Sequence, residues 1–229
     1  AELEKMREAG RLVGEVLTQL AAKVAPGIST AELDELAEKR IAKAGAVPAF
    51  KGYHGYPATI CASINDEVIH GIPSGRRVLV EGDIISLDVG ASIDGYYGDS
   101  AITLAVGRVS EEAATLLRVT EEALFKAIEQ ARPGRRLSDI SHAVQHHVEA
   151  HGFSIVREFV GHGIGQRMHE EPQVPNYGEP GHGPRLAEGM VLAIEPMVNA
   201  GRAAVKVLAD GWTAVTKDKS LSAHFEHTV

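Results

Sequence analysis

Residues 84–106 read Ile-Ile-Ser-Leu-Asp-Val-Gly-Ala-Ser-Ile-Asp-Gly-Tyr-Tyr-Gly-Asp-Ser-Ala-Ile-Thr-Leu-Ala-Val, and this stretch decides the fold around it. Two apolar runs flank Asp94-Gly95, a dipeptide that favours a two-residue hairpin turn. Side chains alternate between the two faces of a strand, so Asp88 and Asp99 can point to one face if their strands pair. The stretch therefore predicts an antiparallel hairpin that carries two carboxylates on the same side.

Two further acidic residues lie in apolar runs, Glu195 in Val-Leu-Ala-Ile-Glu-Pro and Glu226 in Ala-His-Phe-Glu-His-Thr-Val. A buried carboxylate is unfavourable unless it is paired, protonated or bound to a cation, and none of the four runs contains Lys or Arg. The simplest compensation is a shared multivalent cation, with His162 in Gly-His-Gly-Ile-Gly as the nitrogen ligand. Four carboxylates exceed the need of one divalent ion, which indicates two ions and metal-assisted hydrolysis.

The chain repeats one plan after 107 residues. Helical periodicity covers about residues 3–23, and a capping box at Ser29 opens a second helix; a cap at Ser110 begins the same pair again with a helix through about Arg132. In the second helix of each pair, Pro26, Leu33, Leu36, Ala37, Ile41 and Gly45 recur as Pro133, Ile140, Ala143, Val144, Val148 and Gly152. Asp88 maps in the same way onto Glu195.

This internal duplication predicts a single catalytic domain over residues 1–229, with halves of about 1–107 and 108–229. We expect an α/β (α+β) fold in which a pseudo-twofold axis relates the halves. Each half would pack two helices on antiparallel strands, and the acidic pairs would meet where the sheets join.

Composition excludes several classes of function. The net charge is −8 without a basic run, which argues against a nucleic-acid partner. The apolar runs are too short to cross a membrane, and the charged, helix-like N-terminus does not read as a signal peptide. Cys61 is the only cysteine, which precludes an internal disulfide and suits a reducing compartment. We therefore expect a cytoplasmic protein.

Other polar residues suggest chemistry less strongly. The Gly161–Gly165 run lacks the spacing and the lysine of a phosphate-binding loop. Ser100, Ser154 and Cys61 have no evident base and orienting partner, so a nucleophilic triad has no support. The remaining candidates share one helix, lie largely off its apolar face and read as a solvated surface, although histidines spaced i,i+4 can collect metal: His142, His146, His147 and His151.

Over nearly its whole length the chain resembles the type I methionine aminopeptidases. The resemblance is carried by Tyr53-His54-Gly55-Tyr56, Ser63-Ile64-Asn65, His70-Gly71-Ile72-Pro73, Leu87-Asp88-Val89-Gly90, Gly98-Asp99-Ser100-Ala101, Gly161-His162-Gly163-Ile164-Gly165, His169-Glu170-Glu171-Pro172, Ile194-Glu195-Pro196, Asp210-Gly211-Trp212 and Glu226-His227-Thr228. It implies the pita-bread fold and removal of the N-terminal methionine of nascent proteins when the second residue is small. A water or hydroxide that bridges two metals would attack the first peptide bond.

The resemblance also assigns metal ligands. One divalent ion would take Asp99, His162, Glu195 and Glu226, and the other Asp88, Asp99 and Glu226. Carboxylates with one imidazole suit Mn, Fe, Co or Zn without choosing among them. A Na or K ion near backbone carbonyls would have Asn65, Glu67 and Ser222 as candidates.

Catalytic roles follow from the same resemblance. Glu195 would accept a proton from the nucleophile, His70 would lie near the scissile amide nitrogen, and His169 would donate to the substrate carbonyl. The substrate's free amine would bind the metal close to Asp88. With His70 and His169, the substrate would contact Phe50, Tyr53, Tyr56, Cys61, Met168 and Trp212. Phe50 and Met168 depart from the cysteine and phenylalanine often found there.

The family resemblance implies a monomer that acts on nascent chains and leaves open whether it docks transiently on ribosomes. Prolidase and aminopeptidase P share the fold and metals and would cleave Xaa-Pro peptides, but Tyr53-His54-Gly55-Tyr56 favours the methionine enzymes. Type II enzymes insert a subdomain between the positions of His162 and Glu195, and residues 163–194 are too few to hold it. A non-catalytic binding protein on this fold is disfavoured because such relatives lose ligands that are present here.

Overall fold

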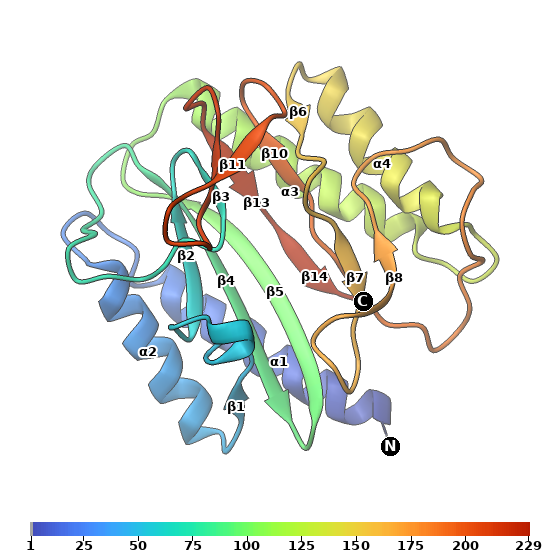
Figure 1. The fold of residues 1–229 in the computed structure, drawn as a ribbon, viewed down its shortest axis with the longest axis horizontal. Helices are drawn as coiled ribbons and strands as arrows, with labels where there is room; N and C mark the ends of the chain where they lie inside the picture. Colours follow the sequence, from blue (N-terminus) through green and yellow to red (C-terminus); the bar gives the residue numbers. More distant parts are fainter. Residues whose placement is uncertain (1) are drawn as a thin grey trace.

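The computed structural model describes residues 2–229 (Figure 1). Its helices are α1 (Glu2–Ala21), α2 (Thr30–Lys43), the 3₁₀ helix η1 (Tyr53–Gly55), α3 (Glu111–Gln130) and α4 (Leu137–Ala150). Its strands are β1 (Val47–Pro48), β2 (Ile60–Ile64), β3 (Glu67–Ile69), β4 (Ile84–Ile93), β5 (Tyr96–Ala105), β6 (Ser154–Ile155), β7 (Gly161–Gly163), β8 (Glu170–Val174), β9 (Leu192–Ile194), β10 (Met197–Asn199), β11 (Val205–Val207), β12 (Ala214–Thr216), β13 (Ser222–His224) and β14 (Glu226–Thr228).

The predicted helices form where their caps place them. The Ser29 hydroxyl accepts from the Glu32 amide and the Glu32 carboxylate accepts from the Ser29 amide, a complete capping box at the start of α2. Ser110 accepts from the Ala113 amide at the start of α3. The predicted ends near residues 23 and 132 are each two residues too long, because the last turn before each Pro-Gly pair leaves the helix.

The repeat is visible in what the helices bury. The residues buried by α1 are Met6, Ala9, Leu12, Val13, Val16, Leu17 and Leu20, and those buried by α3 are Ala113, Leu116, Val119, Thr120, Ala123, Leu124 and Ala127. Each position of the first set becomes the corresponding position of the second on adding 107. Thr30, Leu33, Ala37 and Ile41 of α2 map in the same way onto buried residues of α4. The two helix pairs therefore present equivalent faces to the strands.

The central hairpin has the predicted register. β4 and β5 pair over ten residues from Ile84↔Ala105 to Ile93↔Tyr96. Asp94 and Gly95 both have positive φ, as the favoured two-residue hairpin turn requires. Gly90 lies opposite Asp99, two positions along from Asp88, so the two carboxylates are diagonal neighbours on one face.

The halves join through the pairing of β5 with β14. The large sheet runs in the order β1-β4-β5-β14-β9-β7-β8, with β2 also paired to β4. One core cluster unites α1 and α2 with β2 and β4, and another unites α3 and α4 with β9, β10 and β13. Figure 1 shows the two helix pairs covering the two halves of the strand layer. This is the expected mixed α/β architecture of helices on antiparallel strands.

One strand of the second half differs from its counterpart. β4 is continuous through Asp88, whereas Glu195 lies between β9 and β10 and is followed by Pro196. Proline has no amide proton for the ladder, so pairing stops there. β10 then continues in a smaller sheet with β13 and β6. The mapping of Asp88 onto Glu195 predicted a strand position for Glu195 as well. That prediction was wrong, because Glu195 lies where the chain passes between two sheets.

Close packing of α1 on β5 yields a stability prediction. A Cβ at Gly98 would lie 2.7 Å from the Gly10 nitrogen and 2.9 Å from the Ala9 carbonyl carbon, both backbone atoms of α1. We expect Gly98→Ala to lower the free energy of unfolding by roughly 1–3 kcal/mol because the helix must move away. Gly14→Ala, with open space around the added methyl, should instead raise it by about 0.5–1 kcal/mol. Urea unfolding of both variants measures this, and an unchanged Gly98→Ala would contradict it.

Candidate active site

Five potential ligands converge from separate elements of the large sheet. Asp88 comes from β4, Asp99 from β5, His162 from β7, Glu195 from the β9–β10 junction and Glu226 from the start of β14. Ligand atoms of Asp99, His162 and Glu226 all lie within 4.8 Å of one another. His162 Nε2 is 3.6 Å from Glu195 Oε1.

Asp88, Asp99 and Glu226 are buried, Glu195 is nearly so, and the buried three are only partly hydrogen-bonded. Asp88 Oδ1, Asp99 Oδ1 and Glu226 Oε1 find no partner among residues 2–229. A buried acceptor without a partner is costly, so these oxygens fit a site that binds a cation. His162 adds a suitable nitrogen because its Nδ1 lies 2.8 Å from the Gly163 carbonyl, to which it donates, which leaves the Nε2 lone pair free. The donor set therefore fits divalent metal.

Burial raises the pKa values of the four acids, and a bound cation would oppose this effect. Desolvation raises the pKa of Asp88 to about 7 and that of Glu195 to about 7. It raises the pKa of Asp99 and of Glu226 well above the ordinary range, and the neighbouring carboxylates add to the effect. Without a cation the cluster therefore retains protons near neutrality.

Three polar contacts that the sequence did not reveal hold this cluster in place. The Asp99 amide donates to Thr228 Oγ1 at 3.0 Å, and the same hydroxyl donates to the Asp99 carbonyl at 2.8 Å. Asn176 Nδ2 donates to the Glu195 carbonyl at 2.9 Å. These contacts span long stretches of chain, and no local motif around Thr228 or Asn176 predicts them.

His224 is a functional candidate that the sequence analysis missed. Its side chain is 2% exposed, and its Nε2 is 3.6 Å from Glu195 Oε2, with no hydrogen-bond partner among the described residues. Burial lowers its pKa, which favours the neutral ring. The available signal was its position two residues before Glu226 in the same apolar run.

The four acids line a cavity of about 130 Å³. All the predicted catalytic, ligand and substrate-contact residues line it: Phe50, Tyr53, Tyr56, Cys61, His70, Asp88, Asp99, His162, Met168, His169, Glu195, Trp212 and Glu226. A larger hollow of about 870 Å³ lies between the N-terminal end of α1 and residues 164–172. It lacks this convergence of acids and histidines, so the smaller cavity is the candidate site.

One wall of the cavity is apolar. Phe50, Tyr56, Cys61 and Met168 belong to one buried cluster against which Tyr53 and Trp212 pack. Tyr56 turns its hydroxyl away to donate to the carbonyls of Ile60 and Gly71. The wall therefore offers rings, a thioether and a thiol, while its polar atoms are satisfied elsewhere.

Two histidines also line the cavity, next to aromatic residues of the apolar wall. The His70 ring packs edge-on to Phe159 and Trp212, and burial lowers its pKa to about 4. His169 lies at the exposed rim, with its Nδ1 2.8 Å from the Tyr53 hydroxyl. Partial burial and the neighbouring His162 lower the pKa of His169. Both rings are therefore neutral near pH 7.

The monovalent-cation candidates lie outside this cavity. The Asn65 carbonyl accepts from the Ser222 amide at 2.8 Å, so these two residues are adjacent. Glu67 forms an ion pair with Arg77 and also accepts from the Ile64 amide. Their side chains already have partners within the protein.

Comparison with known proteins shows the family of the chain. Residues 4–229 match the model of metallopeptidase family M24. The chain belongs to this family. It is 59% identical to a methionine aminopeptidase of Clostridium acetobutylicum over 100% of this chain and 91% of the relative. It is equally similar to methionine aminopeptidase 1 of Bacillus subtilis, covering 92% of that protein. The crystal structure of methionine aminopeptidase from Thermotoga maritima superposes with a TM-score of 0.98 at 50% identity, covering 99% of this chain and 91% of that one.

Two less similar solved structures share the fold alone. An X-Pro aminopeptidase of Thermotoga maritima superposes with a TM-score of 0.76 at 21% identity, and a prolidase of Pyrococcus furiosus with 0.76 at 23%. The chain covers 57% and 60% of those structures. Membership of the family establishes a metal-dependent hydrolase with the pita-bread fold. No helix in the described part of the chain is long and apolar enough to cross a membrane.

The raised acid pKa values of this M24 site predict how metal and pH control stability. A carboxylate whose folded pKa exceeds its unfolded pKa stabilises the fold below the unfolded value, and the contribution is lost as pH rises through the folded value. For Asp88 that window runs from 3.8 to about 7. In chelator, wild type should therefore lose stability between about pH 4 and 7, and Asp88→Asn should lose roughly 1–4 kcal/mol less.

With divalent metal at pH 8, wild type should instead be more stable than Asp88→Asn, because only wild type has the Asp88 carboxylate to bind the metal. Thermal unfolding with chelator and with Mn²⁺ measures both effects. Asp94→Asn, at the exposed tip of the same hairpin, is the matched control and should follow wild type. A parallel response of wild type and Asp88→Asn in both conditions would contradict the prediction.

Proposed function

We propose that this chain removes the N-terminal methionine from polypeptides whose second residue is small. The observation that carries the proposal is the convergence, in one small cavity, of five metal-ligand candidates, two neutral histidines and an apolar wall. The two relatives at 59% identity, which are named methionine aminopeptidases, support the removal of methionine.

Two divalent ions are the proposed metal content, because four carboxylates and an imidazole exceed the ligands of one ion. Asp99, His162, Glu195 and Glu226 would hold one ion, and Asp88, Asp99 and Glu226 the other. When bound, the ions would supply Lewis-acid activation of water and of the substrate carbonyl near neutral pH. The donor set suits Mn, Fe, Co or Zn.

Glu195 is the proposed general base. A pKa of about 7, raised by burial, suits proton transfer near neutrality. Its carboxylate oxygens lie 3.6 Å from His162 Nε2 and from His224 Nε2, and Asn176 fixes its backbone. The carboxylate is therefore confined in the lining of the cavity, where it would take a proton from the attacking water.

His169 is the proposed hydrogen-bond donor to the scissile carbonyl. If the Tyr53 hydroxyl donates to Nδ1, the neutral ring carries its proton on Nε2 and can donate it. That hydrogen bond strengthens as negative charge develops on the carbonyl oxygen. His70, held between Phe159 and Trp212, would contact the amide nitrogen.

The substrate's methionine side chain would lie against the apolar wall. Rings and a soft thiol suit an unbranched thioether, and a cavity of about 130 Å³ admits one such side chain. The free amine would bind beside Asp88, which limits cleavage to the first peptide bond. Phe50 occupies the space beside Gly90, where a Cβ would lie 2.7 Å from its ring.

The other assignments stay predictions. A monovalent cation would use the carbonyls near Asn65 and Ser222, with Glu67 contributing least because it is paired with Arg77. A monomeric, cytoplasmic enzyme that contacts ribosomes transiently is consistent with the proposed substrate. An Xaa-Pro peptidase is disfavoured because those relatives share only 21–24% identity.

His169→Ala tests the proposed oxyanion donor. We expect kcat to fall by roughly 10²–10³-fold with a much smaller rise in KM, because the lost hydrogen bond is strongest in the transition state. Metal content should stay unchanged, and His182→Ala, an exposed histidine elsewhere, should behave as wild type. Loss of metal from His169→Ala would make it a ligand instead.

Peptide competition tests the function itself. Met-Ala-Ser and Met-Gly-Ser should be cleaved, Met-Leu-Ser and Met-Lys-Ser should be poor substrates, and N-acetylated Met-Ala-Ser should resist cleavage. Chelator should abolish release of free methionine, and added Mn²⁺ or Co²⁺ should restore it. Equal turnover of Met-Ala-Ser and Met-Leu-Ser would reject the size selection, and faster cleavage of Xaa-Pro peptides would replace the proposal.

A further inference from the structure

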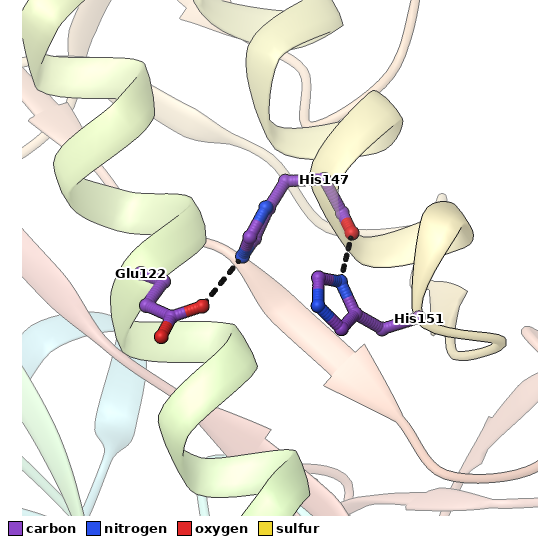
Figure 2. Close-up of side chains that lie close together, drawn as sticks. All are labelled: Glu122, His147 and His151. Atoms are coloured by element: carbon purple, nitrogen blue, oxygen red, sulfur yellow. Dashed lines mark hydrogen bonds and ion pairs between the residues drawn. The ribbon is translucent and has the colours of Figure 1, made fainter.

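A second cluster of potential ligands lies between α3 and α4. Figure 2 shows Glu122 projecting from α3 toward His147 and His151 on α4. One ligand atom from each lies within 4.8 Å of the other two. None of the three residues lines the catalytic cavity. The sequence analysis placed these histidines on a solvated surface, which is wrong for His147, whose side chain is only 12% exposed.

Hydrogen bonds already orient each ligand. His151 Nδ1 lies 2.8 Å from the His147 carbonyl, to which it donates, and this leaves the lone pair on His151 Nε2. Arg118 Nη1 donates to Glu122 Oε1 at 2.8 Å, which leaves Oε2 for another partner. That oxygen lies 3.0 Å from His147 Nε2 (Figure 2). The three side chains therefore present two nitrogens and one oxygen to a common point.

The internal repeat supplies a comparison for this cluster. Subtracting 107 from Glu122 and His147 gives Glu15 and Arg40, which form an ion pair between α1 and α2. The first half thus has a plain interhelical ion pair where the second half has a carboxylate and an imidazole. His151 corresponds to Ala44, so the second half also adds a ligand that the first half lacks.

The protonation states of His147 and Glu122 near neutral pH favour metal binding. Burial lowers the pKa of His147, and the hydrogen bond from Arg118 lowers the pKa of Glu122. Near pH 7 the imidazole is neutral and the carboxylate is ionised. A metal at His147 Nε2 would replace the proton shared with Glu122, and the ring would carry that proton on Nδ1 instead.

We propose that Glu122, His147 and His151 form a Zn²⁺ site that joins α3 to α4. Two imidazoles and one carboxylate are typical zinc ligands, and water can take the fourth position. Zn²⁺ binds such ligands at about 2.0–2.2 Å, so the three atoms must approach one another slightly. Glu122 and His151 can do so because both are partly or fully exposed on the helix surface. Because the site contacts both helices, its occupancy stabilises their packing by mass action.

Equilibrium dialysis against buffered Zn²⁺ tests the site, with bound zinc counted by elemental analysis. The catalytic cavity contributes equally to every variant, so differences between variants report this cluster alone. We expect His151→Gln and Glu122→Gln to bind one zinc fewer than wild type. Each should weaken zinc affinity at the cluster at least ~10-fold, as loss of a ligand or its support does.

His146→Gln is the matched control. His146 also belongs to an i,i+4 pair on α4, but its partner His142 contacts the Gly178 carbonyl, and neither joins a carboxylate in a ligand group within residues 2–229. This variant should bind as much zinc as wild type. Equal zinc in His151→Gln, Glu122→Gln and wild type would overturn the proposal, as would the same loss in His146→Gln.

His147→Arg separates ligation from helix packing. It recreates the Glu15–Arg40 pair of the first half, so without zinc it should unfold at the wild-type temperature. With zinc it should be stabilised less than wild type, because only the contribution of the catalytic cavity remains. If His147→Arg and wild type respond equally to zinc in thermal unfolding, the cluster is an interhelical contact only and the proposal fails.

Discussion

Four carboxylates meet near the pairing of β5 with β14. Their mutual repulsion in a largely buried site is the constraint on which the rest of the structure around the site depends. No Lys or Arg lines the cavity that holds them. The metal-free cluster must therefore keep protons, as the raised pKa values of Asp88 and Glu195 indicate. Metal binding removes both the repulsion and the protons, so the stability of the fold and the chemistry of the site are linked through the same atoms.

The surrounding architecture holds these groups together in spite of that repulsion. The ten-residue β4–β5 ladder fixes Asp88 and Asp99 as diagonal neighbours. The Thr228 hydroxyl, on the adjoining strand, forms hydrogen bonds with both the amide and the carbonyl of Asp99. Pro196 interrupts the corresponding strand in the second half, so Glu195 lies at a junction between sheets. Glu195 lies beside His162 and His224, which suits it to proton transfer as well as to metal binding.

The two helix pairs have equivalent apolar packing but different polar contacts. Every residue buried by α1 has a buried counterpart in α3, because both faces must fill equivalent spaces against the strands. The polar contact at the edge of each helix pair is under no such restriction. Glu15 with Arg40 in one half and Glu122 with His147 in the other give the same interhelical link with different potential to bind metal.

The amino-acid sequence by itself determined the hairpin at Asp94-Gly95, the capped helices, the register of the repeat and the identity of the acids, because these depend on local backbone preferences and on periodicity. Resemblance to a family added His70, His169 and the residues of the apolar wall. Only the tertiary structure decided that Asn176 holds Glu195, that His224 is buried beside it and that Glu122 reaches His147. Each of these contacts joins groups that are far apart in the sequence, and neither spacing nor propensity encodes the distance between such groups.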